Sequence, residues 1–269
     1  MRVIMAGCGN MGFAMLKAWL GSGVLKPADC VVVEPAEALR ERAAGHGVTA
    51  VAAAGDIPGD MTADVVVLAV KPQVMGQAAP AYRRFADQGA TFLSIAAGTT
   101  IATLQSLLGE GAAIVRCMPN TPAAIGEGMM VTYANAKVTP AAMDGINGLL
   151  KQNGAVAAIP SEDLMDAVTA VSGSGPAYVF HFIEALTAAG ISAGLPAETA
   201  DLLARQTVLG AARLAFESGE APGRLREQVT SPNGTTAAAL AILMGDNRLK
   251  MLVEEAVEAA RLRSVELGS

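Results

Sequence analysis

A glycine-rich segment near the start of the chain is the first segment whose residue types and spacing suggest a ligand-binding site. Residues 7–12 read Gly-Cys-Gly-Asn-Met-Gly, which is the spacing G-x-G-x-x-G. After a strand and before a helix, this spacing predicts a dinucleotide site, because the glycines allow a tight turn and the helix N-terminus offers N–H groups to a pyrophosphate. A plain glycine-rich turn is the alternative. The residues predicted to bind the cofactor here are Gly7, Gly9, Asn10, Met11 and Gly12.

Glu34 follows the apolar run 30–33, roughly 20 residues beyond the glycines, where dinucleotide-binding folds carry an acidic residue. A carboxylate there would accept hydrogen bonds from the ribose hydroxyls of NADH and repel the 2′-phosphate of NADPH. The alternative is a solvated loop carboxylate. Arg40 and Arg42 lie further along the chain and could reach a phosphate. The residues therefore leave both NADPH and NADH open, with a slight preference for NADH.

Three further segments follow apolar strand candidates. Val70 is the last residue of the run 65–70, and Lys71 and Pro72 follow it. Residues 94–98 and 116–122 lie at the ends of the next two strand candidates, 91–95 and 113–116. Open α/β sheets bind their ligands at the carboxyl edge, where these segments would meet. Each segment taken alone is typical of a turn.

Two loops in the second half of the chain precede apolar helices. Residues 172–178 read as a helix stop, an N-cap at Ser174 and a first-turn proline. Residues 231–236 likewise read as a capping loop. A functional role arises if the N–H groups of residues 234–236 bind a carboxylate, as helix N-termini do.

The elements that must position these residues change character after Pro160. Up to that point, strand candidates alternate with amphipathic stretches, which predicts a parallel Rossmann-type sheet over residues 1–160. Beyond it the pattern is helical, which predicts an all-α substrate-binding and dimerisation domain over 161–269. The strand candidates are 2–6, 30–33, 65–70, 91–95, 113–116, 128–133 and 154–159. The helix candidates are 140–150, 161–171, 176–193, 196–218, 236–244 and 247–267.

The helix candidate at 177–193 predicts an oligomer. Its only full charge is Glu184, so it should be buried on nearly every side. A helical domain of this size offers limited cover, and a second subunit is the natural source of the rest. We expect a homodimer at least.

Composition argues against several functional classes. The net charge is −6 and no block of basic residues occurs, which argues against nucleic acid as a partner. Glycines and Lys17 interrupt the apolar N-terminal stretch, and glycines and threonines divide residues 88–109, so neither a signal peptide nor a membrane span is expected. The three cysteines and two histidines lack metal-ligand or disulfide spacing. We expect a cytoplasmic protein that binds no metal.

Together and in this order, these motifs resemble those of the pyrroline-5-carboxylate reductase family over essentially the whole chain. The segments that carry the resemblance are 7–12, 70–73, 116–122, 172–178 and 231–236, of which the last two are the most diagnostic. The resemblance implies a Rossmann domain, a helical dimerisation domain and dimers that often assemble into rings. It also implies that NADPH or NADH reduces a small cyclic imine, Δ1-pyrroline-5-carboxylate, to proline.

The resemblance also assigns roles to residues. Thr236 is the expected catalytic residue, beside the ring nitrogen of the substrate. The expected substrate-binding residues are Ser231, Asn233, Gly234, Thr235, Thr236 and Ser174. Besides the glycine-rich segment, the expected cofactor-binding residues are Glu34, Val70, Lys71, Pro72, Ala97, Met118 and Asn120. Three features depart from the family pattern: Asn233 where many members have glycine, the acidic Glu34, and the lack of an asparagine in 52–60.

Two other functions remain open on the residues alone. One is a related two-domain imine or β-hydroxyacid reductase, which would be expected to offer a lysine or aspartate acid in the helical domain. No lysine occurs between Lys151 and Lys250. The other is a non-catalytic dinucleotide-sensing protein, which would need the first domain but no organised substrate loop.

Overall fold

An eight-stranded sheet forms the centre of the N-terminal half, in the order β3-β2-β1-β4-β5-β6-β7-β8. The computed structural model describes residues 1–268. Neighbouring strands are parallel except β6 and β7, which are antiparallel. The strands are β1 (Val3–Ala6), β2 (Cys30–Val33), β3 (Thr49–Val51), β4 (Val65–Leu68), β5 (Thr91–Ser94), β6 (Ala113–Met118), β7 (Gly128–Ala134) and β8 (Gly154–Ala158). The predicted parallel Rossmann-type sheet is therefore confirmed.

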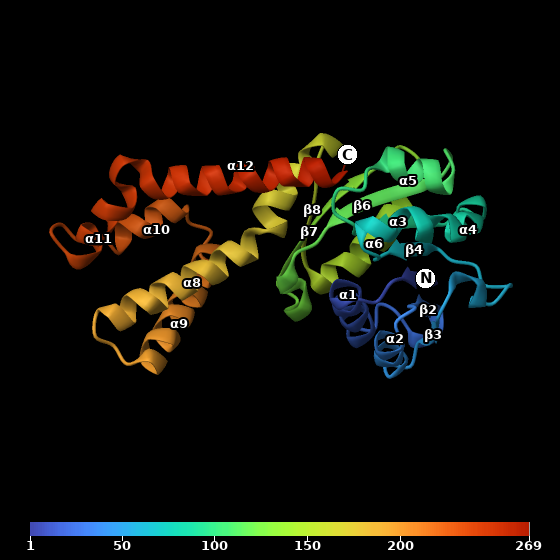
Figure 1. The fold of residues 1–269 in the computed structure, drawn as a ribbon, viewed down its shortest axis with the longest axis horizontal. Coiled ribbons are helices and arrows are strands. Elements are labelled where there is room, and N and C mark those ends of the chain that lie inside the picture. Colours follow the sequence, from blue (N-terminus) through green and yellow to red (C-terminus); the bar gives the residue numbers. More distant parts are fainter. Residues whose placement is uncertain (269) are drawn as a thin grey trace. The chain divides into compact units, whose positions relative to one another are not determined.

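Helices cover both faces of this sheet (Figure 1). On one face, Met15 and Trp19 of α1 (Asn10–Gly21) are fully buried in a cluster that α2 (Glu37–Ala44) and α6 (Pro140–Leu150) complete. On the other face lie α3 (Pro72–Ala78), α4 (Arg83–Asp87) and α5 (Ile101–Leu108). All four residues of β4 are buried, as an uninterrupted apolar strand between two helical layers should be.

Short 3₁₀ turns connect many of these elements. They span Pro27–Asp29, Ala54–Asp56, Ala79–Tyr82, Thr121–Ile125, Lys151–Asn153, Glu162–Leu164 and Gly245–Asn247. No helix within residues 1–268 is long and apolar enough to cross a lipid bilayer.

The chain forms two compact units. The first contains Met1–Ser174 and the end of the chain from Ala260, and the second contains Gly175–Ala259. Within the first unit, the Ser264 hydroxyl donates to Asp166 Oδ1 at 2.6 Å, which fixes the last turns of α12 (Arg248–Gly268). The domain boundary expected after residue 160 stays a prediction.

The second unit is helical. It contains α8 (Gly175–Ser192), α9 (Ala197–Glu217), α10 (Pro222–Gln228), α11 (Thr235–Met244) and the start of α12. No residue of α8 is buried in the single chain, and Phe180 is 58% exposed. A single subunit therefore does not provide the burial expected for α8, because α9 covers only part of the apolar surface of α8. Pro196, with which the predicted helix 196–218 begins, is the N-cap of α9.

The expected helix stop before α8 is wrong. After α7 (Met165–Val168) the chain makes a π-helical turn, Thr169–Gly173, and continues directly into α8. Ser174 has helical dihedral angles (φ −85°, ψ −24°), and its N–H donates to the Thr169 carbonyl at 2.8 Å. A π turn takes in an extra residue without ending the helix, so Ser174 is not an N-cap.

Candidate dinucleotide and substrate sites

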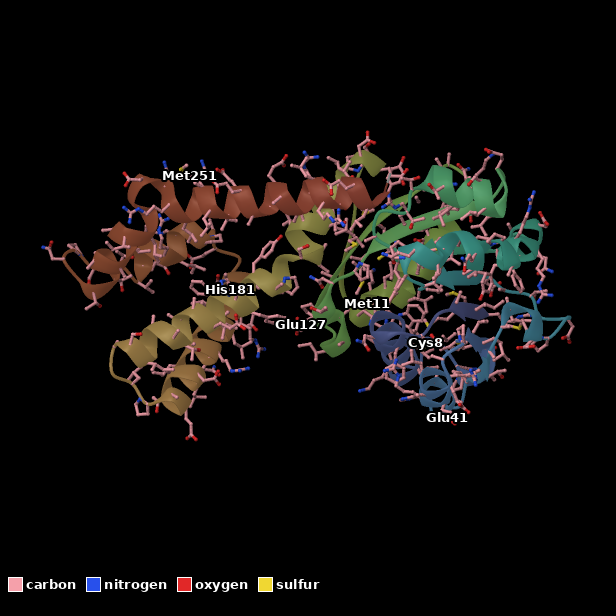
Figure 2. All side chains as sticks on the ribbon, viewed as in Figure 1. Cys8, Met11, Glu41, Glu127, His181 and Met251 are labelled. Atoms are coloured by element: carbon pink, nitrogen blue, oxygen red, sulfur yellow. The ribbon has the colours of Figure 1, made fainter. Side chains whose placement is uncertain are left out.

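The glycines between β1 and α1 form the backbone cradle that their spacing predicts. Gly7 has φ +88°, and a Cβ there would lie 2.8 Å from the Ala69 carbonyl oxygen. A Cβ on Gly12 would lie 2.9 Å from the Gly7 carbonyl oxygen. Gly9 has no atom within 4 Å of its Cβ position, so its surface is open to a ligand. Figure 2 labels Cys8 and Met11 in this segment. The geometry fits a pyrophosphate at the N-terminus of α1.

Glu34 lies against this cradle. It is 8% exposed, and its Oε2 accepts the Cys8 N–H at 2.7 Å while its Oε1 accepts the Ala36 N–H at 3.0 Å. The carboxylate is therefore held in one position by two backbone donors. The alternative of a freely solvated loop carboxylate is wrong, because Glu34 is buried.

The two nearby arginines bind backbone carbonyls. Arg40 donates from Nη1 to the carbonyls of Glu34 and Pro35, both at 3.0 Å. Arg42 donates from Nη2 to the Cys8 carbonyl at 2.7 Å, and its guanidinium lies 4.0 Å from the centre of the Phe13 ring. Both side chains thus shape the glycine-rich segment and the loop after β2.

A cavity of about 500 Å³ opens at the carboxyl ends of β1, β2 and β4. The sequence-predicted residues that line it are Gly7, Gly9, Glu34, Val70 and Lys71. Lys71 is the N-cap of α3 and Pro72 is its first residue. Asn10 and Met11 lie in the first turn of α1. The structure therefore gathers residues from distant parts of the sequence around one cavity.

Ala97 and Ser174 line a second, smaller cavity in the same compact unit. This cavity has a volume of about 260 Å³ and also contacts Thr169, Arg263 and Ser264. The loop after β5 supplies Ala97, and the start of the helical segment supplies Ser174. Two residues that were expected on the cofactor side and the substrate side, respectively, thus share one cavity.

Asn120 and Met118 connect the end of β6 to the π-helical turn. Asn120 donates from Nδ2 to the Ser172 carbonyl at 3.1 Å, and its Oδ1 accepts the Met129 N–H at 2.8 Å. A Cβ on Gly173 would lie 2.5 Å from Met118 Cε, so the two residues pack closely. These contacts give Asn120 and Met118 structural roles that the sequence pattern does not predict.

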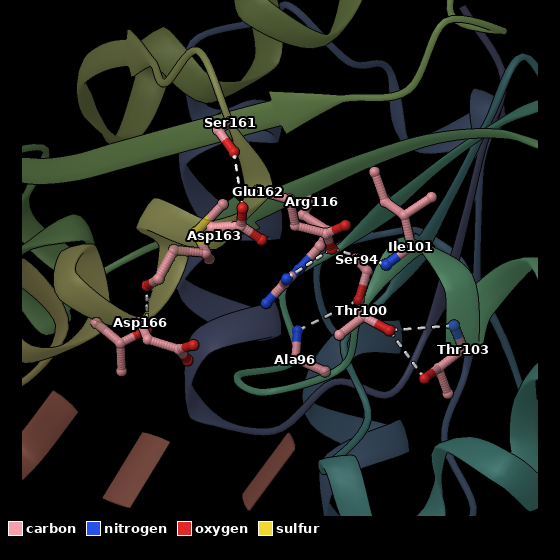
Figure 3. Close-up of polar contacts among 12 residues, drawn as sticks. Ser94, Ala96, Thr100, Ile101, Thr103, Arg116, Ser161, Glu162, Asp163 and Asp166 are labelled. Atoms are coloured by element: carbon pink, nitrogen blue, oxygen red, sulfur yellow. Dashed lines mark hydrogen bonds and ion pairs between the residues drawn. The ribbon is translucent and has the colours of Figure 1, made fainter. Parts of the chain in front are cut away.

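An ion pair that sequence reasoning missed lies beside the loop after β5 (Figure 3). Arg116, which is 6% exposed, donates from Nη1 to Glu162 Oε1 at 2.7 Å. The same oxygen accepts the Ile101 N–H, at the start of α5, at 2.8 Å. The one available signal was a charged residue at the end of an apolar strand. Its partner, 46 positions away, could not be read from the sequence.

The loop before α11 is a tight turn within the second unit. The Gly234 N–H donates to the Ser231 carbonyl at 3.1 Å, and a Cβ on Gly234 would collide with Ser231 Oγ. Asn233 has φ +58°, in the left-handed region that asparagine tolerates better than most residues. This explains why asparagine can replace the glycine of the family pattern. Helix α11 begins at Thr235, so its first N–H groups lack intrahelical partners.

Two cysteine thiols buried in the same core cluster, those of Cys8 and Cys30, are poor nucleophiles. Burial raises the pKa of Cys8 to about 11, against smaller opposing effects of Arg42. Burial likewise raises the pKa of Cys30 to about 12. The thiolate, which is the reactive form, is therefore scarce at neutral pH.

Comparison with known proteins assigns the chain to a family. Residues 162–267 match the model described as pyrroline-5-carboxylate reductase dimerisation, and residues 2–98 match that described as NADP oxidoreductase coenzyme F420-dependent. The pyrroline-5-carboxylate reductase of Pseudomonas aeruginosa is 42% identical over 99% of this chain and 97% of its own length. The chain belongs to the pyrroline-5-carboxylate reductase family. The resemblance noted from the sequence is confirmed.

Solved structures of pyrroline-5-carboxylate reductases have the same fold. The protein from Coxiella burnetii is 34% identical, with a TM-score of 0.93 over 100% of this chain and 98% of its own. The protein from Plasmodium falciparum, solved with NADP bound, is 30% identical, with a TM-score of 0.87 over 100% of this chain and 98% of its own. The dimerisation model matched by residues 162–267 also indicates that this family member is an oligomer.

Proposed function

We propose that this chain reduces Δ1-pyrroline-5-carboxylate to proline, using NADPH or NADH. The observation that carries the proposal is the full-length similarity to pyrroline-5-carboxylate reductases of bacteria and plants, from 37% to 42% identical over nearly the whole chain. The glycine-rich cradle, Glu34 and Lys71 around one cavity support a dinucleotide as the cofactor.

The residues of the cradle fit a reduced nicotinamide dinucleotide, which supplies a hydride when it is bound. Gly7 and Gly9 leave room for the pyrophosphate, and the N-terminus of α1 offsets its charge. Glu34, which lines the same cavity, would accept hydrogen bonds from the adenosine ribose. Lys71 and Ala97 are proposed to lie beside the nicotinamide. The role of the protein at this end is to fix the ring in position, since orientation alone can supply much of a rate enhancement.

Thr236 and the start of α11 are proposed to hold the substrate. The N–H groups of Thr235 and Thr236 would bind the carboxylate, because a helix N-terminus is a ready anion site. The Gly234 N–H already donates a hydrogen bond to the Ser231 carbonyl, so the role of Gly234 is to shape the turn. The substrate imine is most electrophilic when protonated, and its N–H would donate to the Thr236 hydroxyl oxygen. Hydride addition to the carbon then yields a secondary amine without a further acid.

The assembly and its location are also proposals. The exposed apolar side chains of α8, together with the dimerisation domain, support a homodimer. Rings of such dimers and a cytoplasmic location are proposed on the family resemblance.

The deciding experiment is proline formation from pyrroline-5-carboxylate with each reduced cofactor. Purified full-length protein should form one proline for each NADH or NADPH consumed, as measured by absorbance at the nicotinamide band and by chromatography of the product. Consumption of neither cofactor, or oxidation without proline, would overturn the proposed function.

A further inference from the structure

We infer that the Glu34 carboxylate makes this chain select NADH over NADPH. This inference rests on the proposed function, because it concerns the cofactor of that same site. Its starting point is that Glu34 is fixed. Its two carboxylate oxygens accept hydrogen bonds from the backbone N–H groups of Cys8 and Ala36. Glu34 also lines the cavity beside Gly7 and Gly9. Turning the carboxylate away would leave the buried Cys8 N–H without its acceptor, which is costly.

The two arginines nearest Glu34 are held at backbone carbonyls. Arg40 donates to the carbonyls of Glu34 and Pro35, and Arg42 donates to the Cys8 carbonyl while stacking on Phe13. Moving either guanidinium toward a 2′-phosphate would weaken hydrogen bonds that shape the cradle itself. Lys71 lines the same cavity but follows β4, and β1 lies between β4 and the strand that leads to Glu34.

The segment after β2 also lacks side-chain donors for a phosphate. Residues 34–38 read Glu-Pro-Ala-Glu-Ala, with neither a hydroxyl nor a basic side chain. Pro35 has no N–H, and the Ala36 N–H is already donated to Glu34. Glu37 adds a second carboxylate in the first turn of α2, where it opposes the anion-binding tendency of that helix end.

These features suit a ribose 2′-hydroxyl and disfavour a 2′-phosphate. Each carboxylate oxygen can accept more than one hydrogen bond, so Glu34 retains capacity for a ribose hydroxyl besides its backbone donors. A phosphate at the same place would bring two negative groups together, while the two nearest guanidiniums are held at backbone carbonyls. Because a relative of the same fold was solved with NADP, the discrimination is attributed to Glu34 and its surroundings rather than to the fold.

The test is binding of NADH and NADPH to the full-length protein, measured by calorimetry without the imine substrate. The wild type should bind NADH at least about tenfold more tightly, since like charges placed together disfavour binding. Glu34→Gln keeps the side-chain size and removes the charge, so it should reduce the ratio of the two dissociation constants at least about tenfold. Glu41→Gln is the matched control, because Glu41 is an exposed carboxylate of α2 that plays no part in this argument. It should change the ratio less than about threefold.

Two results would overturn the inference. One is wild-type protein that binds NADPH as tightly as NADH, which needs no variant and so does not depend on the folding of Glu34→Gln. The other is an unchanged ratio in a folded Glu34→Gln protein. Neither result bears on the proposed reaction, which the formation of proline tests separately.

Discussion

Removal of the Glu162 carboxylate should destabilise the first compact unit strongly. In Glu162→Ala, the buried Arg116 guanidinium loses its ion-pair partner and the Ile101 N–H loses its acceptor. Breaking a buried ion pair costs about 3–5 kcal/mol, and an unsatisfied N–H adds about 1–3 kcal/mol. Glu162 is a quarter exposed, at 25% of its side chain, so water can replace part of both interactions. We therefore expect a loss of about 3–5 kcal/mol, a large part of a typical domain stability.

Urea unfolding followed by circular dichroism at a fixed subunit concentration measures this loss. The matched control is Asp163→Ala, since Asp163 is the exposed neighbour and accepts only a 3.3 Å hydrogen bond from Ser161. Its unfolding free energy should change by less than about 0.5 kcal/mol. The double variant Arg116→Met/Glu162→Ala should be more stable than Glu162→Ala, because it no longer buries an unpaired charge. A loss below about 1 kcal/mol in Glu162→Ala, or a double variant no more stable than it, would refute this reasoning.

Three further perturbations have expected outcomes. Thr236→Val should lower kcat about 10- to 100-fold with unchanged cofactor affinity, measured by steady-state kinetics and calorimetry, because it removes a hydrogen bond to a charged nitrogen. Gly7→Ala should abolish measurable NADH binding in calorimetry, because its Cβ would meet the Ala69 carbonyl. The free energy of unfolding should fall as pH rises above 9, because the unfolded Cys30 thiol ionises near 9.0 whereas the buried one stays protonated until about 12. In urea titrations, that group contributes at most about 1.4 kcal/mol for each pH unit.

Each of these three predictions has a control. An unaltered kcat in Thr236→Val would remove that residue from the reaction. Gly23 also has positive φ (+76°) but no atom within 4 Å of its Cβ position, so Gly23→Ala measures the backbone cost alone and should leave NADH binding intact. Cys30→Ala should make the alkaline decline shallower, and an identical slope would contradict the role of the buried thiol.

Elements with a strong local pattern were predictable from the sequence. The unbroken apolar run of β4 and the proline-started helix α6 carry their own signals, and residues 140–150 were predicted with the bounds that the structure has. Strand β3 was missed because Thr49–Val51 is too short to establish a period. Helix α10 was missed because Pro222 and Gly223 read as part of a loop.

Features set by tertiary contacts were not predictable. The glycines around residues 172–178 favour a helix stop locally, whereas packing against Met118 and the Asn120 hydrogen bond to Ser172 accompany a continuous π turn. The position of Glu34 at the cradle followed from its spacing, but the backbone donors that hold it did not. The hydrogen bonds of Arg40 and Arg42 to backbone carbonyls were likewise not predictable, because they depend on how the loop after β2 folds back.

The path of the chain through its two compact units has a consequence for how fragments behave. Because the chain leaves the first unit after Ser174 and returns to it at Ala260, the helical unit is topologically an insertion. A single cut between them cannot yield both units whole. A fragment ending at residue 174 would lack the hydroxyl of Ser264 that Asp166 binds and one wall of the cavity beside Ala97. Residues from Ala260 onward thus complete a cavity whose other wall is formed by residues up to Ser174.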